Sequence, residues 1–343
     1  MSALDRPVTI IDIATAAGVS KATVSRALRH DPDTSPSTRQ HVLAVARDLG
    51  YVVNAHAQAL RSAAPSIVGA VLRDSSNPIY GALHVALQRS ADARGMSVVA
   101  LTAVDPDHPE NEIRAIETLL ELRVSGILIC SATAASHDIA SVRGRVPMIS
   151  LASPVGDSGM HSVAYDERAA GRTIADEIVD AGHRTIAVHE VSRSESLSVH
   201  MRTSSIISAC RRAGAEVVRI PYGRRHDDAK GITAAMESGS TVIACANDAA
   251  LLRYATVAHR EGISVPEDLS LVGCDHVGSF ADPSLGLTSY RLPVEETAEA
   301  GVELMCTLLR DSGTAVRQRR LRGEFIPGGT LSRRATADSL IRQ

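Results

Sequence analysis

Apolar residues follow two patterns along this chain of 343 residues, and the patterns divide it into a short helical segment and a long mixed one. Up to about residue 50, apolar positions recur every three or four residues, as in short amphipathic helices. From about residue 66 onward, short runs rich in Val, Ile and Leu alternate with helical patterns, as in α/β folds. We therefore expect an all-α segment at residues 1–53, a connection at 54–65 and an α/β body at 66–343.

The segment from Thr9 to Leu28 predicts two short helices around a tight turn. Gly18 supplies the backbone freedom that a sharp turn needs, and Ser20 can cap the second helix. Apolar residues share one face of the first helix: Ile10, Ile13, Ala14 and Ala17. Short polar and cationic residues lie on the outer face of the second: Lys21, Ala22, Thr23, Ser25 and Arg26. Such side chains suit base edges and phosphates, so we interpret the segment as a DNA-reading helix-turn-helix, with an ordinary surface hairpin as the alternative.

The residues that follow favour the DNA-reading interpretation. Ser35 and Pro36 provide an N-cap and a proline at the first position of a third helix. This helix carries apolar residues at helical spacing: Val42, Val45, Ala46 and Leu49. Three such helices can bury one small core.

The body from residue 66 onward predicts two lobes, because its alternation of strands and helices begins a second time. The expected strands are Ile67–Leu72, Ser97–Leu101, Gly126–Cys130, Arg184–His189, Glu216–Ile220, Thr241–Cys245 and Leu269–Cys274. The expected helices are Ile79–Arg94, Glu110–Leu122 and three that begin near Ser198, Asp228 and Asp248. Each lobe is thus expected to be a doubly wound α/β layer structure.

Composition fits a cytoplasmic, multidomain protein. With 343 residues and 44% hydrophobic content the chain can bury sizeable cores. It contains no apolar run of the roughly 18 residues that a membrane helix needs, and no apolar signal region precedes the first helix. Its five cysteines are widely spaced, so we expect buried free thiols rather than disulfides or a metal cluster.

Charge and motifs further narrow the function. Residues 1–64 contain seven Lys/Arg and five Asp/Glu, whereas the remainder contains 29 and 34, so DNA affinity is expected at one end only. The patterns G-x-S-x-G, G-x-x-x-x-G-K-[ST] and H-E-x-x-H are absent from the sequence, and an enzyme is not expected. We expect no cofactor, and the 13 histidines are dispersed.

Three motifs in order resemble the LacI/GalR family of bacterial transcriptional regulators. They are V-T-I-x-D-I-A-x-x-A-G-V-S-x-x-T-V-S-R-x-L from residue 8, T-R-x-x-V from residue 38 and L-G-Y-x-x-N-x-x-A-x-x-L-R from residue 49. Further matching stretches are Ser76-Asn77-Pro78, Arg123-Val124-Ser125-Gly126-Ile127, Ala181-Gly182-His183-Arg184, Ala246-Asn247-Asp248-Ala249 and residues 265–273. The resemblance implies a periplasmic-binding-protein-like core whose chain crosses between lobes, here near 163, 288 and 323.

The same resemblance implies a repressor that binds a palindromic operator as a homodimer. Lys21, Ala22 and Arg26 would face base edges, while Thr23 and Ser25 would contact phosphates. Residues 54–61 would form a hinge helix, in which Ala57 permits close approach and Leu60 inserts into the minor groove and kinks the DNA. The full set of expected DNA-binding residues is Thr9, Ser20, Lys21, Ala22, Thr23, Ser25, Arg26, Arg29, Asn54, Ala57 and Leu60.

A small-molecule effector is expected at the carboxyl ends of the strands, between the lobes. The expected effector-binding residues are Asn77, Ile79, Tyr80, Ser196, Ser198, Arg202, His226, Asn247, Asp248 and Asp275. Several have alternative roles: the two asparagines can shape turns, Asp248 can cap a helix and Arg202 can form a surface ion pair. A solute-binding protein of the same core fold is the alternative function, and residues 1–64 argue against it.

The chain departs from the family pattern where the ligand is expected. Aromatic residues are only 2% of the chain, and His226 occupies the expected stacking position. Ala152-Ser153 replaces a frequent aspartate, His189-Glu190-Val191 replaces a glycine pair, and Ser205 replaces the glycine of R-x-x-G. Since sugars commonly lie against aromatic faces, a simple hexose is less strongly expected than in the family at large.

Overall fold

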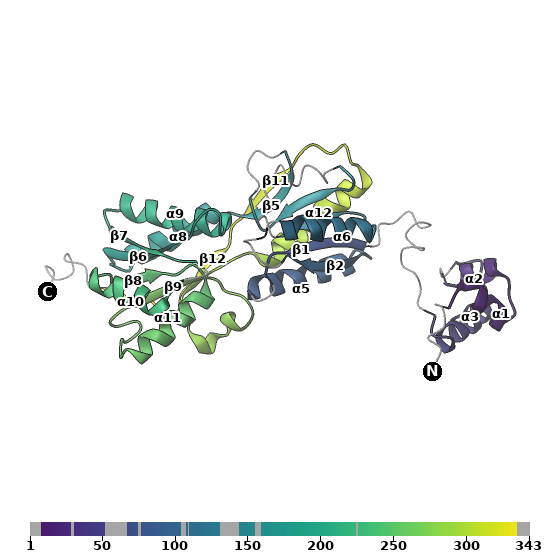
Figure 1. The fold of residues 1–343 in the computed structure, drawn as a ribbon, viewed down its shortest axis with the longest axis horizontal. Coiled ribbons are helices and arrows are strands. Elements are labelled where there is room, and N and C mark those ends of the chain that lie inside the picture. The colour runs from purple at the N-terminus through teal and green to yellow at the C-terminus, as the bar shows by residue number, and fades with distance from the viewer. Residues whose placement is uncertain are drawn as a thin grey trace. The chain divides into compact units, whose positions relative to one another are not determined.

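The computed structural model describes residues 8–28, 31–51, 67–74, 77–103, 108, 110–130, 144–154, 159–223 and 226–334. The chain divides into two compact units, Met1–Ala64 and Pro65–Gln343, and each is described by itself (Figure 1).

The smaller unit contains three helices, α1 (Ile10–Ala17), α2 (Lys21–Leu28) and α3 (Pro36–Asp48). Gly18 ends α1 in the left-handed conformation, with φ of 64°, and so makes the turn to α2 possible. The buried core joins all three helices through Ile13, Ala17, Val24, Ala27, Leu28, Val42 and Ala46. The predicted three-helix arrangement is confirmed.

Side-chain caps fix where these helices begin. Ser20 Oγ accepts a hydrogen bond from the backbone N–H of Thr23 at 3.0 Å. Ser35 Oγ accepts one from the N–H of Thr38 at 3.2 Å, directly before Pro36. Each bond satisfies a backbone donor that the first turn of a helix leaves without a partner.

The larger unit consists of two lobes, each built on a sheet (Figure 1). In the described part of the chain, the first sheet has the order β11-β5-β4-β3-β1-β2, and all its pairs are parallel. Its strands are β1 (Ile67–Leu72), β2 (Ser97–Thr102), β3 (Ile127–Ile129), β4 (Met148–Leu151), β5 (His161–Tyr165) and β11 (Gln318–Leu321). Its helices are α5 (Pro78–Asp92), α6 (Glu110–Glu121) and α12 (Val294–Arg310).

The second sheet has the order β12-β10-β9-β8-β6-β7, with only the β10–β12 pair antiparallel among the described strands. Its strands are β6 (Thr185–Glu190), β7 (Glu216–Pro221), β8 (Val242–Ala244), β9 (Ser270–Asp275), β10 (Ser289–Arg291) and β12 (Glu324–Ile326). Its helices are α8 (Glu167–Asp180), α9 (Leu197–Arg212), α10 (Asp228–Glu237) and α11 (Asp248–Arg260), and two short 3-10 helices, η1 (Gly278–Ala281) and η2 (Pro283–Leu285), follow β9. The predicted pair of doubly wound lobes is confirmed.

The chain crosses between the lobes at three places within the described residues. The first crossing lies at Asp166 and the second at residues 292–293, slightly after the predicted positions near 163 and 288. The reason is that β5 and β10 continue to pair within their own sheets up to Tyr165 and Arg291. The third lies at residues 322–323, as predicted. A Cβ at Gly323 would collide with the carbonyl oxygen of Arg291, so this crossing requires glycine.

Buried apolar residues join the two lobes. One core cluster includes Val68 and Leu83 of the first lobe together with Val242 and Cys274 of the second. No helix in the part of the chain that the structure describes is both long enough and apolar enough to span a membrane.

Candidate functional site

The outer face of α2 presents the polar residues expected to read DNA. Lys21, Ala22 and Arg26 are exposed, and Thr23 and Ser25 are half-buried. The opposite face of the helix is fully apolar: Val24, Ala27 and Leu28 are buried. The helix is therefore held by its inner face alone, which leaves its outer face available for a groove.

The other expected DNA-binding residues have different surroundings. Thr9 is half-buried, and its hydroxyl donates to the Asp12 carboxylate at 2.7 Å at the start of α1. Ser20 is exposed and caps α2. Arg29, Asn54, Ala57 and Leu60 lie outside the described residues.

A cavity lies between the two lobes, at the carboxyl ends of their parallel strands. It has an enclosed part of about 70 Å³ and a wider, adjoining part of about 860 Å³. Residues at or just beyond the ends of β1, β3, β4, β5, β8 and β9 line it: Arg73, Cys130, Ala152, Tyr165, Asn247 and Asp275. This position, at the strand ends of an open α/β sheet, is where ligands bind.

The cavity brings together nearly all the residues predicted to bind an effector. Its enclosed part is lined by Asn77, Ile79, Tyr80, Ser196, Ser198, Arg202, Asn247 and Asp275. His226 lines the wider part. Ser198 of the second lobe lies 3.3 Å from Ser153 of the first, oxygen to oxygen, so the lobes also contact each other here.

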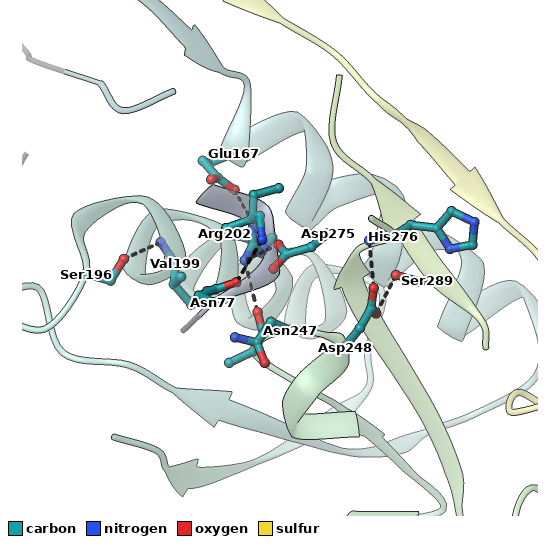
Figure 2. A network of polar contacts seen from close by, with 12 residues as sticks. Asn77, Glu167, Ser196, Val199, Arg202, Asn247, Asp248, Asp275, His276 and Ser289 are labelled. Atoms are coloured by element: carbon teal, nitrogen blue, oxygen red, sulfur yellow. Dashed lines mark hydrogen bonds and ion pairs between the residues drawn. The ribbon is translucent and has the colours of Figure 1, made fainter. Parts of the chain in front are cut away.

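Arg202 is the centre of a buried polar network (Figure 2). Its Nη1 donates to the Glu167 carboxylate at 2.6 Å, and its Nη2 donates to the carbonyl oxygen of Ala246 at 3.0 Å. The same Nη2 lies 3.9 Å from Asp275 Oδ1. Arg202 and Glu167 are each only 2% exposed, so the alternative of a surface ion pair is wrong.

Asp275 occupies an unusual conformation at the end of β9. Its φ is 107°, a region that L residues rarely adopt and that is found where a site holds a side chain in place. Burial raises the pKa of its carboxyl to about 8, although the nearby Arg202 lowers it. At neutral pH the carboxyl is therefore largely protonated and can both donate and accept hydrogen bonds.

Asp248 differs from the other predicted residues, because its carboxylate bonds within the fold and is not among the residues that line the cavity. Its Oδ2 accepts from the backbone N–H of His276 at 2.6 Å, and its Oδ1 accepts from Ser289 Oγ at 2.6 Å (Figure 2). The residue is fully buried, which raises its pKa to about 6. Asp248 thus joins α11 to β10 and to the residue that follows β9. The sequence could not separate it from Asn247, its neighbour in the chain.

Both asparagines are helix caps as well as cavity residues. Asn77 Oδ1 accepts from the N–H of Ile79 at 3.1 Å, and Asn247 Oδ1 accepts from the N–H of Ala250 at 2.8 Å. A backbone N–H can only donate, so these bonds fix which amide atom is the oxygen. The NH2 groups are left as donors for the cavity.

An aromatic cluster that the sequence did not predict forms one wall of the wider part. Tyr222 stacks on His189 with ring centroids 4.3 Å apart, and His226 stacks on Tyr254 at 5.8 Å. His189 Nδ1 accepts from the N–H of Ala246 at 3.1 Å, and burial lowers its pKa well below the ordinary value. The histidine that departs from the family pattern therefore supports the Tyr222 ring.

The low aromatic content is misleading because the aromatic residues are concentrated at the cavity. Of the six tyrosines in the chain, Tyr80, Tyr165 and Tyr222 line it. Tyr165 ends β5, and Tyr222 directly follows β7. The rule that strand ends carry ligand contacts would have found Tyr222, which follows the predicted strand Glu216–Ile220, whereas Tyr165 ends a strand that was not predicted.

Comparisons with known proteins agree with both parts of this arrangement. Residues 9–54 match the bacterial regulatory proteins of the lacI family, and residues 175–331 match a periplasmic binding protein-like domain. The HTH-type transcriptional regulator in the aml 5′ region of Streptomyces limosus is 30% identical, over 85% of this chain and 86% of its own length. The regulator DegA of Bacillus subtilis is 28% identical, over 84% of this chain and 87% of its own.

A solved structure supports the fold. The Lac repressor dimer bound to operator and the anti-inducer ONPF matches with a TM-score of 0.81 at 24% identity, covering 95% of this chain and all of that one. The chain therefore belongs to the lacI family of bacterial regulatory proteins, as a DNA-binding transcriptional regulator that combines a helix-turn-helix unit with a periplasmic-binding-protein-like body.

Proposed function

We propose that the protein is a repressor that binds a palindromic operator as a homodimer. Its affinity for the operator falls or rises when a small molecule occupies the cavity. The observation that carries this proposal is a cavity lined by side chains from both lobes, in a chain that also presents an exposed reading helix. A ligand that contacts both lobes changes the relative free energies of the possible arrangements of the two lobes. Such coupling between two sites is typically about 1–3 kcal/mol.

The DNA contacts follow from the faces of α2. Lys21, Ala22 and Arg26 contact base edges in the major groove, and Thr23 and Ser25 contact phosphates. Leu60 would insert into the minor groove at the centre of the operator. This last role rests on the sequence, and the solved dimer of the Lac repressor bound to its operator supports the dimeric arrangement.

The effector is proposed to be sugar-like. A structural relative is described in complex with cellobiose, and others with ribose and D-xylulofuranose. The cavity of this chain offers neutral hydrogen-bonding groups beside aromatic rings, the combination that suits a ring with many hydroxyl groups. The contacts are proposed for Asn77, Ile79, Tyr80, Ser196, Ser198, Arg202, His226, Asn247 and Asp275.

The test begins with selection of an operator from random DNA, followed by titration of that operator with and without a panel of sugars and polyols. One compound is expected to change the operator affinity about 5- to 150-fold. Asp275→Ala should lose this response while still binding the operator. If no palindromic sequence is enriched, or if Asp275→Ala responds as the wild type does, the corresponding half of the proposal is wrong.

Leu60→Ala tests the hinge role separately. Loss of the inserted side chain should weaken binding to the selected operator far more than binding to unrelated DNA. Equal weakening of both would contradict the minor-groove role of Leu60.

A further inference from the structure

Arg202, the buried arginine of the enclosed part, is already paired with a carboxylate of this chain. Glu167, the first residue of α8, bonds Arg202 of α9 at 2.6 Å, and Asp275 lies 3.9 Å away on the other side. The remaining nearby bond goes to a backbone carbonyl oxygen, of Ala246. Burial raises the pKa of Glu167, and the neighbouring Arg202 opposes this increase. The 2.6 Å distance between the two side chains is typical of a charge-assisted hydrogen bond.

The close packing of α8 and α9 holds the pair in place. A Cβ at Gly171 would collide with the carbonyl oxygen of Arg202 and would lie 2.7 Å from Ser205 Cβ. Gly171 on α8 therefore allows the two helices to approach closely, although Ser205 stands on α9 where the family pattern has a glycine. Ser205 also donates to the carbonyl oxygen of Arg168 at 2.8 Å, which ties the helices together.

In the enclosed part, the Glu167 carboxylate balances the charge of Arg202. The other ionisable residues among its described lining are Arg73 and Asp275, and the Asp275 carboxyl is largely protonated at neutral pH because its pKa is raised to about 8. Arg73 is half-buried at the boundary with the wider part, and one of its Nη atoms donates to the backbone oxygen of Glu195. An anion that approached Arg202 would also have to lie beside the Glu167 carboxylate, which is unfavourable.

The other polar groups of the enclosed part are uncharged. They include the NH2 groups of Asn77 and Asn247 and the hydroxyl groups of Tyr80, Ser153, Tyr165, Ser196 and Ser198. The Tyr165 hydroxyl is buried and has no hydrogen-bond partner among the residues that the structure describes. A buried polar group without a partner is costly, and a ligand hydroxyl would satisfy it.

We propose that Glu167 is a specificity-determining residue that restricts the effector to uncharged polyhydroxylated molecules and excludes their carboxylate- or phosphate-bearing counterparts. This inference rests on the proposed function, namely that the cavity holds the effector. Without the Glu167 charge, the positive charge of Arg202 in the cavity would be uncompensated, and the site would attract anions.

The test measures binding of matched pairs to the full-length protein by calorimetry. Suitable pairs are glucose with glucuronate, galactose with galacturonate and ribose with ribose 5-phosphate. The wild type should bind the neutral member of a pair at least about tenfold more tightly. In Glu167→Gln, which keeps an oxygen acceptor for Arg202, the ratio should shift toward the acid by about tenfold or more, as expected for a charged hydrogen bond.

Two further variants separate selectivity from a purely structural role. Asp228→Asn removes the carboxylate that lies 3.0 Å from Arg253 in the wider, more exposed part, and should shift the ratio less than about threefold because solvent screens this pair. Glu167→Gln combined with Arg202→Gln restores neutrality and should abolish the gain in acid binding. If Glu167 were only structural, its substitution would weaken both members of a pair equally and leave the ratio unchanged.

The outcomes distinguish this inference from the function on which it rests. Wild-type protein that binds the acid as tightly as its neutral partner overturns the inference without the need for any variant. A Glu167→Gln protein that is folded, as verified by thermal melting, and whose ratio of affinities for the neutral and acidic compounds is unchanged also overturns the inference. If neither the wild type nor Glu167→Gln binds any sugar or acid, the proposed effector role of the cavity is itself wrong.

Discussion

The reading helix and the effector cavity use polar side chains in opposite ways. On α2, Lys21 and Arg26 extend into solvent from a helix that is held by its apolar side. In the cavity, Arg202 is buried and bound to Glu167 of the same chain. The difference teaches that a surface for a highly charged polymer needs only exposed cations on a stable helix. A pocket for a small molecule must first satisfy its own charges.

For the same reason, substitutions in the two regions differ in their effect on the free energy of unfolding. An exposed cation on α2 contributes little to the free energy of unfolding, because water solvates it in both states. A buried ion pair contributes little net stability as a pair, but removal of one member leaves a charge that nothing solvates.

The largest effect is expected from Arg202→Met. Removal of the guanidinium leaves Glu167 buried without a cation, which should lower the free energy of unfolding by about 3–5 kcal/mol. Urea denaturation of the larger unit measures this change. The matched control is Arg253→Met: this arginine is about half-exposed in its ion pair with Asp228, and its removal should cost no more than about 1 kcal/mol. Equal losses in the two variants would contradict the contrast between buried and exposed cations.

A smaller effect is expected from the ionisation of Asp275. Its pKa is raised to about 8 in the folded protein, whereas an unfolded aspartate titrates near 3.9. Between these two pH values the folded state therefore binds one more proton than the unfolded state. The contribution of Asp275 to the free energy of unfolding is lost as the pH rises toward 8. Asp275→Asn keeps the shape of the protonated aspartate side chain but does not titrate.

The measurement compares wild type and Asp275→Asn by denaturation from pH 6 to pH 8. The wild type should lose stability relative to the variant, by at most about 1.4 kcal/mol per pH unit for one proton. Other titrating groups, such as Asp248, are present in both proteins and cancel in the difference. Parallel pH profiles would show that Asp275 is already ionised at pH 6.

The smallest effect on stability is expected from Lys21→Ala. The side chain is exposed on α2, so the free energy of unfolding should change by less than about 0.5 kcal/mol. Its loss should nevertheless alter the preferred operator sequence and cost about 1–3 kcal/mol at the affected base pair. The control is Arg47→Ala, on an exposed position of α3, which should leave the selected sequence unchanged. An unchanged operator for Lys21→Ala would remove this residue from the reading face.

The elements that depend on nearby residues were predictable from the sequence. The caps at Ser20 and Ser35 act within three residues, and the apolar spacing of each helix lies within one segment. Seven strands of the lobes were found in the same way, whereas β5, β10, β11 and β12 were not predicted. The first two crossings were predicted slightly too early, because the length of β5 and β10 is decided by their neighbours in each sheet.

Within the cavity, the sequence identified residues but not their partners. The family motifs and strand ends predicted Arg202, Asn247 and Asp275, and these residues do line the cavity. Asp248 was predicted to bind the effector but lies outside the cavity lining, because its position beside Asn247 does not reveal which way its carboxylate points. Glu167 was missed because an acidic residue in the first turn of a helix is common on any protein surface.

The sequence by itself determined the helix-turn-helix, the alternation of strands and helices and the polar residues at the strand ends, because each of these depends on short-range spacing. Only the tertiary structure decided that Glu167, Arg202 and Asp275 meet and that Tyr222 lies on His189. These contacts join residues far apart in the chain through the packing of α8 against α9 and the order of strands in the second sheet. The charge of the cavity, and hence the class of effector that we propose, is set by that packing.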